Sequence, residues 1–437
     1  MTATPYSQRR KQLQTKMRHG IAVIPNAPEV RRNSDTHYDY RFDSHFYYLT
    51  GFTEPESVLV LLAGASTQSI LFCREKNLER EIWDGHRYGP DAACKLFEFD
   101  AAYPISQLDE KLVELMAGQP VLSYPVGTDP HWDARLLKLR EAVKSKSRSG
   151  MRVPNELHDV RGHLDEMRLL KDENEFGILR RAAKISCDAH LRAMRFTHSG
   201  KFEYEVEAEL LHEFCRHGAR HPAYTSIVAG GANACTLHYV GNNAKLNAGE
   251  LLLIDAGCEL DGYASDITRT FPVNGKFSAA QKDVYEVVLA AQTAAISAAT
   301  CGATWNAPHE AALQVLARGF IDLKLCHGSV ESVIGDESYK QFYMHRTGHW
   351  LGMDVHDVGH YRMRKDWRKL EPGMILTVEP GIYVAGDAKR VKPIYRGIGV
   401  RIEDDILVTA DGHENLPEAA PKEIGEIAEL RSKAVRG

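Results

Sequence analysis

Short apolar runs alternate with helical periodicity through the first third of the chain. Apolar residues fill the runs at 57–64, 69–75 and 120–125, whereas 108–118 (LDEKLVELMAG) places its apolar residues at helical spacing. Alternating strands and helices of this kind predict an α/β domain.

A polar segment interrupts this pattern, and a strong helix start follows it. The segment at 143–156 (VKSKSRSGMRVPNE) has no apolar periodicity, which indicates a connection between domains. Asp172, with Glu175 three residues later, forms a capping box before the run FGILRRAAKI. We therefore expect a smaller amino-terminal domain at 1–170 and a second domain at 171–437.

The elements change order after this point. Two helical stretches, at about 172–196 and 203–217, precede a group of strands. A further helix opens at Ser278, where Gln281 completes another capping box, and more strands follow the later helices. Runs of helices followed by runs of strands are typical of an α+β domain.

Composition narrows the class of protein. The 437 residues exceed the usual single core, so two or three domains are expected. The net charge of -5 arises from 54 basic and 59 acidic residues without a basic cluster, which argues against nucleic acid or membrane partners. The chain has no stretch typical of a signal peptide or membrane span. Its eight scattered cysteines favour free thiols in a reducing compartment, so a cytoplasmic location is expected.

Two aspartates flank a predicted turn within 250–273 (ELLLIDAGCELDGYASDITRTFPV). Asp255 and Asp266 flank the turn that contains Asp261 and Gly262, so an antiparallel hairpin would hold them nearly opposite on one face. Like charges in that arrangement destabilise a hairpin unless one is protonated or a cation separates them. Because Asp255 ends an apolar run, a buried cation site is favoured over an exposed turn with incidental acids.

Further candidate ligands lie nearer the end of the chain. Apolar runs around Glu379 and Glu403 predict strands that bring two more carboxylates toward the interior. The segment HRTGHWLGMDVHDVG, between the two pairs, carries His345, His349 and His356. Four carboxylates with one imidazole suit two divalent ions of the manganese type better than a thiolate zinc site. A water shared by two such ions would lose a proton near neutral pH.

The candidate ligands resemble, in order and surroundings, those of the dinuclear metallopeptidases with the creatinase/aminopeptidase fold, called pita-bread. They are Asp255, Asp266, His349, Glu379 and Glu403. The stretch at 37–62 (HYDYRFDSHFYYLTGFTEPESVLVLL) is similar to that family's creatinase-like amino-terminal domain, and 163–186 (HLDEMRLLKDENEFGILRRAAKIS) to its domain junction. Within the family, the resemblance is strongest to aminopeptidase P. It implies an α+β pita-bread domain preceded by a smaller α/β domain, and removal of an amino-terminal residue that precedes proline.

The resemblance also implies a role for each ligand. Asp255 would bind one ion, His349 and Glu379 the other, and Asp266 with Glu403 would bridge the two. A hydroxide between the ions, expected to be Mn²⁺, would attack the scissile carbonyl of the peptide. Glu379 would relay a proton to the leaving nitrogen.

Other residues are expected to contact the peptide. By resemblance, the histidines at 238, 345 and 356 would donate hydrogen bonds to the attacked carbonyl or shape the proline pocket. The expected substrate-binding residues are His238, His345, His356, Tyr383, Arg401, Trp83 and Arg148. Proximity to an active site, of this subunit or of a neighbour in a homodimer or homotetramer, and plain surface exposure explain Trp83 and Arg148 equally well.

Three alternatives stand beside this interpretation. Prolidase shares the fold and ligands but takes only Xaa-Pro dipeptides, and Arg346, where relatives have smaller neutral residues, is a candidate partner for the dipeptide carboxylate. Creatinase lacks the five-ligand set, and non-catalytic pita-bread modules have typically lost their ligands. The stretches at 46–57 and 349–359 resemble aminopeptidase P more than prolidase, so cleavage of Xaa-Pro-Yaa and longer peptides is expected.

Overall fold

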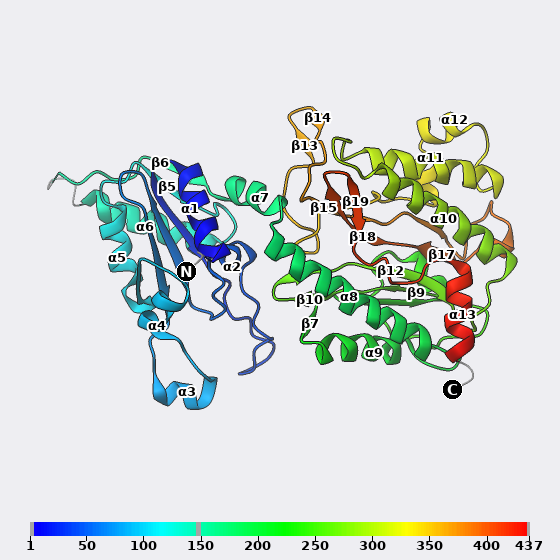
Figure 1. The fold of residues 1–437 in the computed structure, drawn as a ribbon, viewed down its shortest axis with the longest axis horizontal. Coiled ribbons are helices and arrows are strands. Elements are labelled where there is room, and N and C mark those ends of the chain that lie inside the picture. Colours follow the sequence, from blue (N-terminus) through cyan, green and yellow to red (C-terminus); the bar gives the residue numbers. More distant parts are fainter. Residues whose placement is uncertain (1–3, 146–149, 435–437) are drawn as a thin grey trace. The chain divides into compact units, whose positions relative to one another are not determined.

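The computed structural model describes residues 4–145 and 150–434, which fold into two compact units, Met1–Met167 and Arg168–Gly437 (Figure 1). The division expected at residues 170 and 171 on the basis of sequence stays a prediction. Within the described residues, no helix combines the length and apolar character that crossing a bilayer requires.

The first unit is built on one six-stranded mixed sheet with the strand order β4-β3-β2-β1-β5-β6. The strands are β1 (Gly20–Pro25), β2 (Val58–Ala63), β3 (Gln68–Cys73), β4 (Ala101–Pro104), β5 (Val121–Tyr124) and β6 (Glu156–Asp159). The helices are α1 (Pro5–Met17), α2 (Ser44–Thr50), α3 (Leu78–Asp84), α4 (Gly89–Leu96), α5 (Leu108–Met116) and α6 (Pro130–Ser145), and α7 (Arg161–Leu169) leads out of this unit.

Burial explains why the apolar runs of this unit form strands. Every residue of β2 is buried, as expected for a central strand covered on both faces. Val60 of β2 packs in one core with Leu112 of α5 and Leu136 of α6. The predicted α/β alternation is thus confirmed, with the runs at 57–64, 69–75 and 120–125 forming β2, β3 and β5.

The polar segment at 143–156 is not a connection between the two units. α6 continues to Ser145, and β6, which begins at Glu156, pairs in parallel with β5. This part of the prediction was wrong because β6 is an edge strand whose four residues are all exposed. It therefore has no apolar alternation by which a strand can be recognised.

The second unit places helices around several small antiparallel sheets (Figure 1). Its helices are α8 (Glu173–Phe196), α9 (Glu203–Arg216), α10 (Ala279–Ala298), α11 (Ala307–Asp322), α12 (Val330–Gly335) and α13 (Ile424–Ala434). Three strands, in the order β12-β9-β8, form one sheet: β8 (Ile227–Gly230), β9 (Leu251–Asp255) and β12 (Thr268–Pro272). The other strands near the site are β10 (Cys258–Leu260), β11 (Tyr263–Ala264), β15 (Ile375–Val378), β16 (Gly381–Val384), β17 (Ile398–Arg401) and β18 (Asp404–Thr409).

Both predicted capping boxes are present. Asp172 accepts from the backbone N–H of Glu175 at the start of α8, and Ser278 accepts from that of Gln281 at the start of α10. The polar side chains at these positions satisfy N–H groups that the first helical turn leaves unpaired. The predicted α+β order of elements is confirmed.

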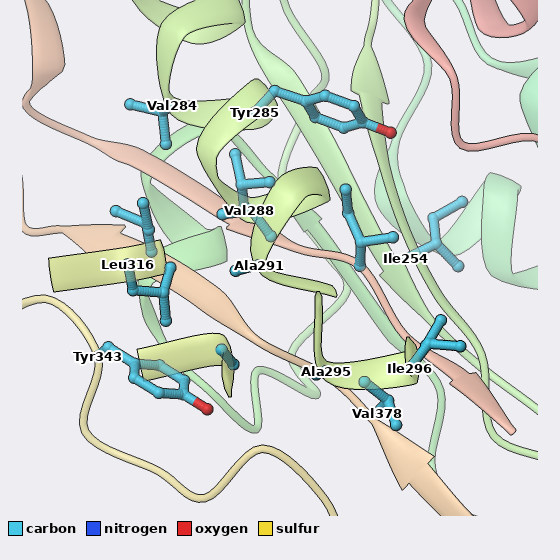
Figure 2. Close-up of a cluster of buried hydrophobic side chains, with 14 of the residues drawn as sticks. Ile254, Val284, Tyr285, Val288, Ala291, Ala295, Ile296, Leu316, Tyr343 and Val378 are labelled. Atoms are coloured by element: carbon cyan, nitrogen blue, oxygen red, sulfur yellow. The ribbon is translucent and has the colours of Figure 1, made fainter. Parts of the chain in front are cut away.

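One face of α10 anchors the sheets that carry the site. Val284, Val288, Ala291 and Ala295 recur at helical spacing and are buried. Figure 2 shows them in one cluster with side chains from other elements, among them Ile254, Leu316 and Val378. Strands β9 and β15, which end beside the candidate ligands, are therefore fixed against one helix.

Candidate metal centre and active site

The hairpin that continues from β9 to β12 positions the first two carboxylates. Its register pairs Asp255 with Thr268, and the turn lies at Asp261 and Gly262, both with positive φ angles (51° and 80°). Such a pair of residues in the left-handed region makes a tight hairpin turn, for which Asp-Gly is a favoured sequence. The register puts Thr268 opposite Asp255, two residues beyond the expected partner Asp266. Both aspartates are buried and contact one shared hydroxyl.

A tyrosine that the sequence analysis missed lies between these two carboxylates. The Tyr224 hydroxyl is 2.6 Å from Asp255 Oδ1 and also contacts Asp266 Oδ1. Burial, with the charges of both aspartates adding to it, raises the pKa of Tyr224 well above its usual value, so the hydroxyl keeps its proton. Tyr224 therefore holds two like charges at a short separation.

Glu379 and Glu403 complete a cluster of four buried or half-buried carboxylates. Glu379 follows β15, and Glu403 lies between β17 and β18, where its Oε2 accepts from the Thr268 hydroxyl at 2.6 Å. Burial raises the pKa of Glu403 well above its usual range and that of Glu379 to about 7, and neighbouring carboxylates add to both shifts. Such shifts mark a site where several anions converge without enough cations to neutralise them.

His349 is oriented so that one ring nitrogen faces this cluster. Its Nε2 lies 3.3 Å from Asp266 Oδ2 and 3.7 Å from Glu379 Oε1, while its Nδ1 lies 3.0 Å from the carbonyl of Trp350. A backbone carbonyl on one nitrogen fixes the tautomer that leaves the other free for a metal. Asp266, His349 and Glu403 each offer one ligand atom, and these atoms lie within 4.8 Å of one another. Oxygen donors with one imidazole fit a divalent metal ion.

Arg401 neutralises one side of the cluster. The guanidinium is buried, with Nη2 2.6 Å from Asp255 Oδ2 and Nη1 3.1 Å from the Tyr383 hydroxyl. The same hydroxyl lies 2.8 Å from Nε2 of His345. Burial, with the charge of Arg401 adding to it, lowers the pKa of His345 to about 4, so this imidazole is neutral at pH 7.

The candidate ligands and pocket residues line one cavity of about 460 Å³. A wall of apolar side chains faces them from Ile227, Leu237, Val240 and Val355. The expected residues that line the cavity are Asp255, Asp266, His349, Glu379, Glu403, His238, His345, His356 and Arg401. A cavity of this size with an apolar wall and converging polar groups suits the end of a short peptide.

Of the expected substrate-binding residues that the structure describes, Tyr383 and Trp83 do not line the cavity. Tyr383 is buried behind it and reaches His345 and Arg401 through its hydroxyl. Trp83 belongs to α3 in the first unit, where its side chain is 80% exposed, and Arg148 lies outside the described residues. The roles expected for Trp83 and Arg148 stay predictions.

Matches to known families and structures follow the same division of the chain. Residues 177–410 match the model of metallopeptidase family M24, and residues 6–123 match the aminopeptidase P amino-terminal domain. The chain belongs to metallopeptidase family M24. The expected fold for an M24 enzyme of this kind, a pita-bread domain after a smaller α/β domain, is confirmed.

M24 relatives match the chain along nearly its whole length. The Xaa-Pro aminopeptidase of Escherichia coli K12 is 44% identical over 428 residues, which are 97% of each chain. The structure of aminopeptidase PepP from Pseudomonas aeruginosa has a TM-score of 0.98 at 49% identity and covers both chains in full. Zinc-substituted aminopeptidase P of E. coli in complex with product has a TM-score of 0.96 at 43% identity, over 98% of each chain.

Proposed function

We propose that this M24 metallopeptidase is a Xaa-Pro aminopeptidase, which removes the first residue of a peptide when the second is proline. The observation that carries the proposal is the cavity in which five ligand-type side chains and three further histidines converge. Relatives that match the chain from end to end carry the name Xaa-Pro aminopeptidase.

Two divalent ions, Mn²⁺ in the cell, are the proposed cofactors. Asp255, Asp266, His349, Glu379 and Glu403 would hold these ions, with Asp255 toward one, His349 and Glu379 toward the other, and Asp266 and Glu403 shared. When bound, such ions make water nucleophilic at neutral pH and polarise a carbonyl group. The raised pKa values of Glu379 and Glu403 support the proposal. They mean that the site destabilises the ionised carboxylates, and a bound cation would stabilise that ionised form.

The chain's own residues orient the peptide and move the proton. Glu379 carries the proton to the proline nitrogen, which as a tertiary amide has no N–H of its own. His238 and His356 donate hydrogen bonds to the substrate carbonyls. His345 shapes the pocket instead, because its Nδ1 bonds the Arg346 carbonyl and its Nε2 the Tyr383 hydroxyl. Arg401 acts on the peptide indirectly. Its guanidinium bonds the Tyr383 hydroxyl, which in turn bonds His345, and these contacts fix the positions of both side chains.

The surroundings of Arg346 favour aminopeptidase over prolidase. A dipeptidase needs a cation placed to pair with the free carboxylate of proline. The Arg346 guanidinium instead contacts Asn306 Oδ1 and lies 5.2 Å from the centre of the Trp367 ring. Arg346 lines the cavity, but these partners engage its guanidinium, which argues against a role as the carboxylate partner of a dipeptide.

Association and location are part of the proposal. α3 has no buried residue, and Leu78, Ile82 and Trp83 on it are between 73% and 81% exposed, which supports a homodimer or homotetramer that covers them. The eight cysteines are all free, which supports a reducing, cytoplasmic location.

A peptide panel tests the proposed activity. The enzyme, loaded with Mn²⁺, is assayed on Xaa-Pro-Yaa, on the dipeptide Xaa-Pro and on Xaa-Ala-Yaa. Efficient cleavage is expected for the first, slower cleavage for the second and negligible cleavage for the third. Efficient cleavage of the dipeptide with intact tripeptide would replace the proposal with prolidase.

A further inference from the structure

A buried ionic cluster lies next to the segment that carries His356. Arg168 and Lys171 come from the sequence RLLK, and both contact Asp357, the residue after His356. Arg168 Nη2 is 2.5 Å from Asp357 Oδ1, and Lys171 Nζ is 3.0 Å from Asp357 Oδ2. The three side chains are at most 2% exposed. Arg168 also pairs with the half-buried Asp354 at 2.7 Å.

Such a cluster fixes geometry more than it stabilises the fold. Desolvation offsets most of the attraction between buried charges, so apolar residues of the same size would serve stability equally well. Directional bonds to both carboxylate oxygens, however, leave Asp357 a single orientation.

The backbone around His356 is folded onto the Asp357 carboxylate. The Asp357 N–H donates to the Trp350 carbonyl at 2.9 Å, and the Asp354 N–H lies 3.4 Å from Asp357 Oδ1. A Cβ added to Gly352 would lie 2.1 Å from Asp357 Oδ2, so the carboxylate occupies the space that a side chain would need. The Gly352 carbonyl in turn accepts from the N–H of Ala264, two residues before the candidate ligand Asp266.

His356 depends on this backbone for its position. Its ring lines the cavity, with its centre 4.2 Å from that of His349. Within residues 4–145 and 150–434, no hydrogen bond holds the His356 ring itself. The orientation of the ring is therefore set by the chain on either side.

We propose that Arg168, Lys171 and Asp357 are positioning residues that hold His356 at the peptide. The inference rests on the proposed aminopeptidase function. It assigns the RLLK sequence a role in catalysis that does not involve binding metal. A displaced hydrogen-bond donor loses transition-state contact, and a shift of about 1 Å lowers the rate about a hundredfold. None of the three side chains is itself a candidate metal ligand, so metal content should stay near normal when one of them is changed.

A double-mutant cycle with His356 tests the proposal. Lys171→Met and Asp357→Asn are each made alone and with His356→Ala, and kcat, KM and metal content are measured on Xaa-Pro-Yaa with Mn²⁺. Each single variant is expected to lower kcat/KM by about 10- to 100-fold, mostly in kcat, with normal metal content. When either change is added to His356→Ala, it should lower kcat/KM by less than about a further twofold. The His356 ring, through which the change acts on the peptide, has already been removed.

Two control variants separate positioning from general damage. Lys171→Arg keeps the charge beside Asp357 and should restore most of the activity lost in Lys171→Met. Leu112→Ala opens a cavity in the core of the first unit and should lower the Tm while leaving kcat/KM near the wild-type value.

The outcomes distinguish this inference from the proposed function. Losses that multiply in the double variants, or loss of metal from Lys171→Met, would overturn the positioning role. If Asp357→Asn does not fold, the cycle with Lys171→Met decides alone. A wild-type enzyme that cleaves none of the peptides would instead overturn the proposed function.

Discussion

Asp255 shows how single residues balance charge in this site. Burial and the neighbouring Asp266 raise the pKa of Asp255, whereas Arg401 and the Tyr224 hydroxyl oppose that shift. One carboxylate of four is thus paired with a protein cation. Arg401 neutralises only part of the negative charge of the four carboxylates, and divalent ions would offset the remainder.

Substitutions of the proposed metal ligands and substitutions of the pocket histidines should have different effects on metal content. Asp266→Asn and Glu403→Gln should lose bound metal and nearly all turnover, because each oxygen is proposed to lie between two ions. His238→Ala and His356→Ala should keep their metal while kcat/KM falls by about a hundredfold, as for other single oxyanion donors. Metal analysis of each purified variant, beside steady-state kinetics, checks this division, and metal-free His356→Ala would contradict it.

Removing the Tyr224 hydroxyl should weaken metal binding without changing the shape of the site. Tyr224→Phe leaves Asp255 and Asp266 without their shared donor, and a change of this kind beside metal ligands lowers affinity by about 10- to 100-fold. Titration with Mn²⁺ measures the effect. Tyr285→Phe removes another buried hydroxyl, which donates to the carbonyl of Lys422, and should bind Mn²⁺ as the wild type does.

Sequence alone singled out the candidate ligands that the structure brings together, but not the residues that support them. Asp255 and Asp266 are foreseeable because they flank an Asp-Gly turn, and strand alternation from Asp266 could also have singled out Thr268, which binds Glu403. Tyr224 had no such signal, since it lies in a loop 31 positions before Asp255. Side chains brought in by tertiary packing leave no local pattern.

At the scale of elements, patterns with strong local chemistry were predictable. Both capping boxes begin helices as expected because the bonds involved join residues only three apart. β6 escaped prediction because an exposed edge strand depends on its neighbour β5 and not on its own apolar residues. Its register with β5 is fixed by the sheet as a whole.

The cap of α10 should contribute measurably to stability. Ser278→Ala removes the acceptor for the Gln281 N–H, which should lower the free energy of unfolding by about 1 kcal/mol. For a unit of this size, the Tm should fall by about 2–4 °C. Ser297→Ala, an exposed change within the same helix, is the matched control and should leave the Tm unchanged or slightly higher in calorimetry.

For the whole molecule, metal and pH should act together on stability. In the metal-free protein, burial raises the pKa of Glu379 to about 7, and the facing carboxylates overcome burial to raise that of His349 to about 9. Protons on these groups stabilise the fold fully at low pH, and that contribution is lost as pH rises through 7 and then 9. Metal replaces the protons, so its stabilising effect should grow with pH.

The difference in Tm between Mn²⁺-loaded and chelated protein measures this linkage. It should widen from pH 6 to pH 9, and Mn²⁺ binding should release protons, detected by calorimetry in buffers of different ionisation enthalpy. In Asp266→Asn, the widening should largely disappear. A difference in Tm that is constant over this range would contradict the assigned ligands.

Residues that bond one another in the site are far apart in the sequence. This separation determines when the site can form during synthesis. The bond from Arg401 to Asp255 joins residues 146 positions apart, and that from Thr268 to Glu403 joins residues 135 apart. Ribosomes add about 5–20 residues each second, so the first aspartates emerge many seconds before their partners. Until β17 and β18 leave the exit tunnel, the nascent chain presents scattered donors that cannot enclose an ion. Metallation therefore has to wait until β17 and β18 have been synthesised and have emerged.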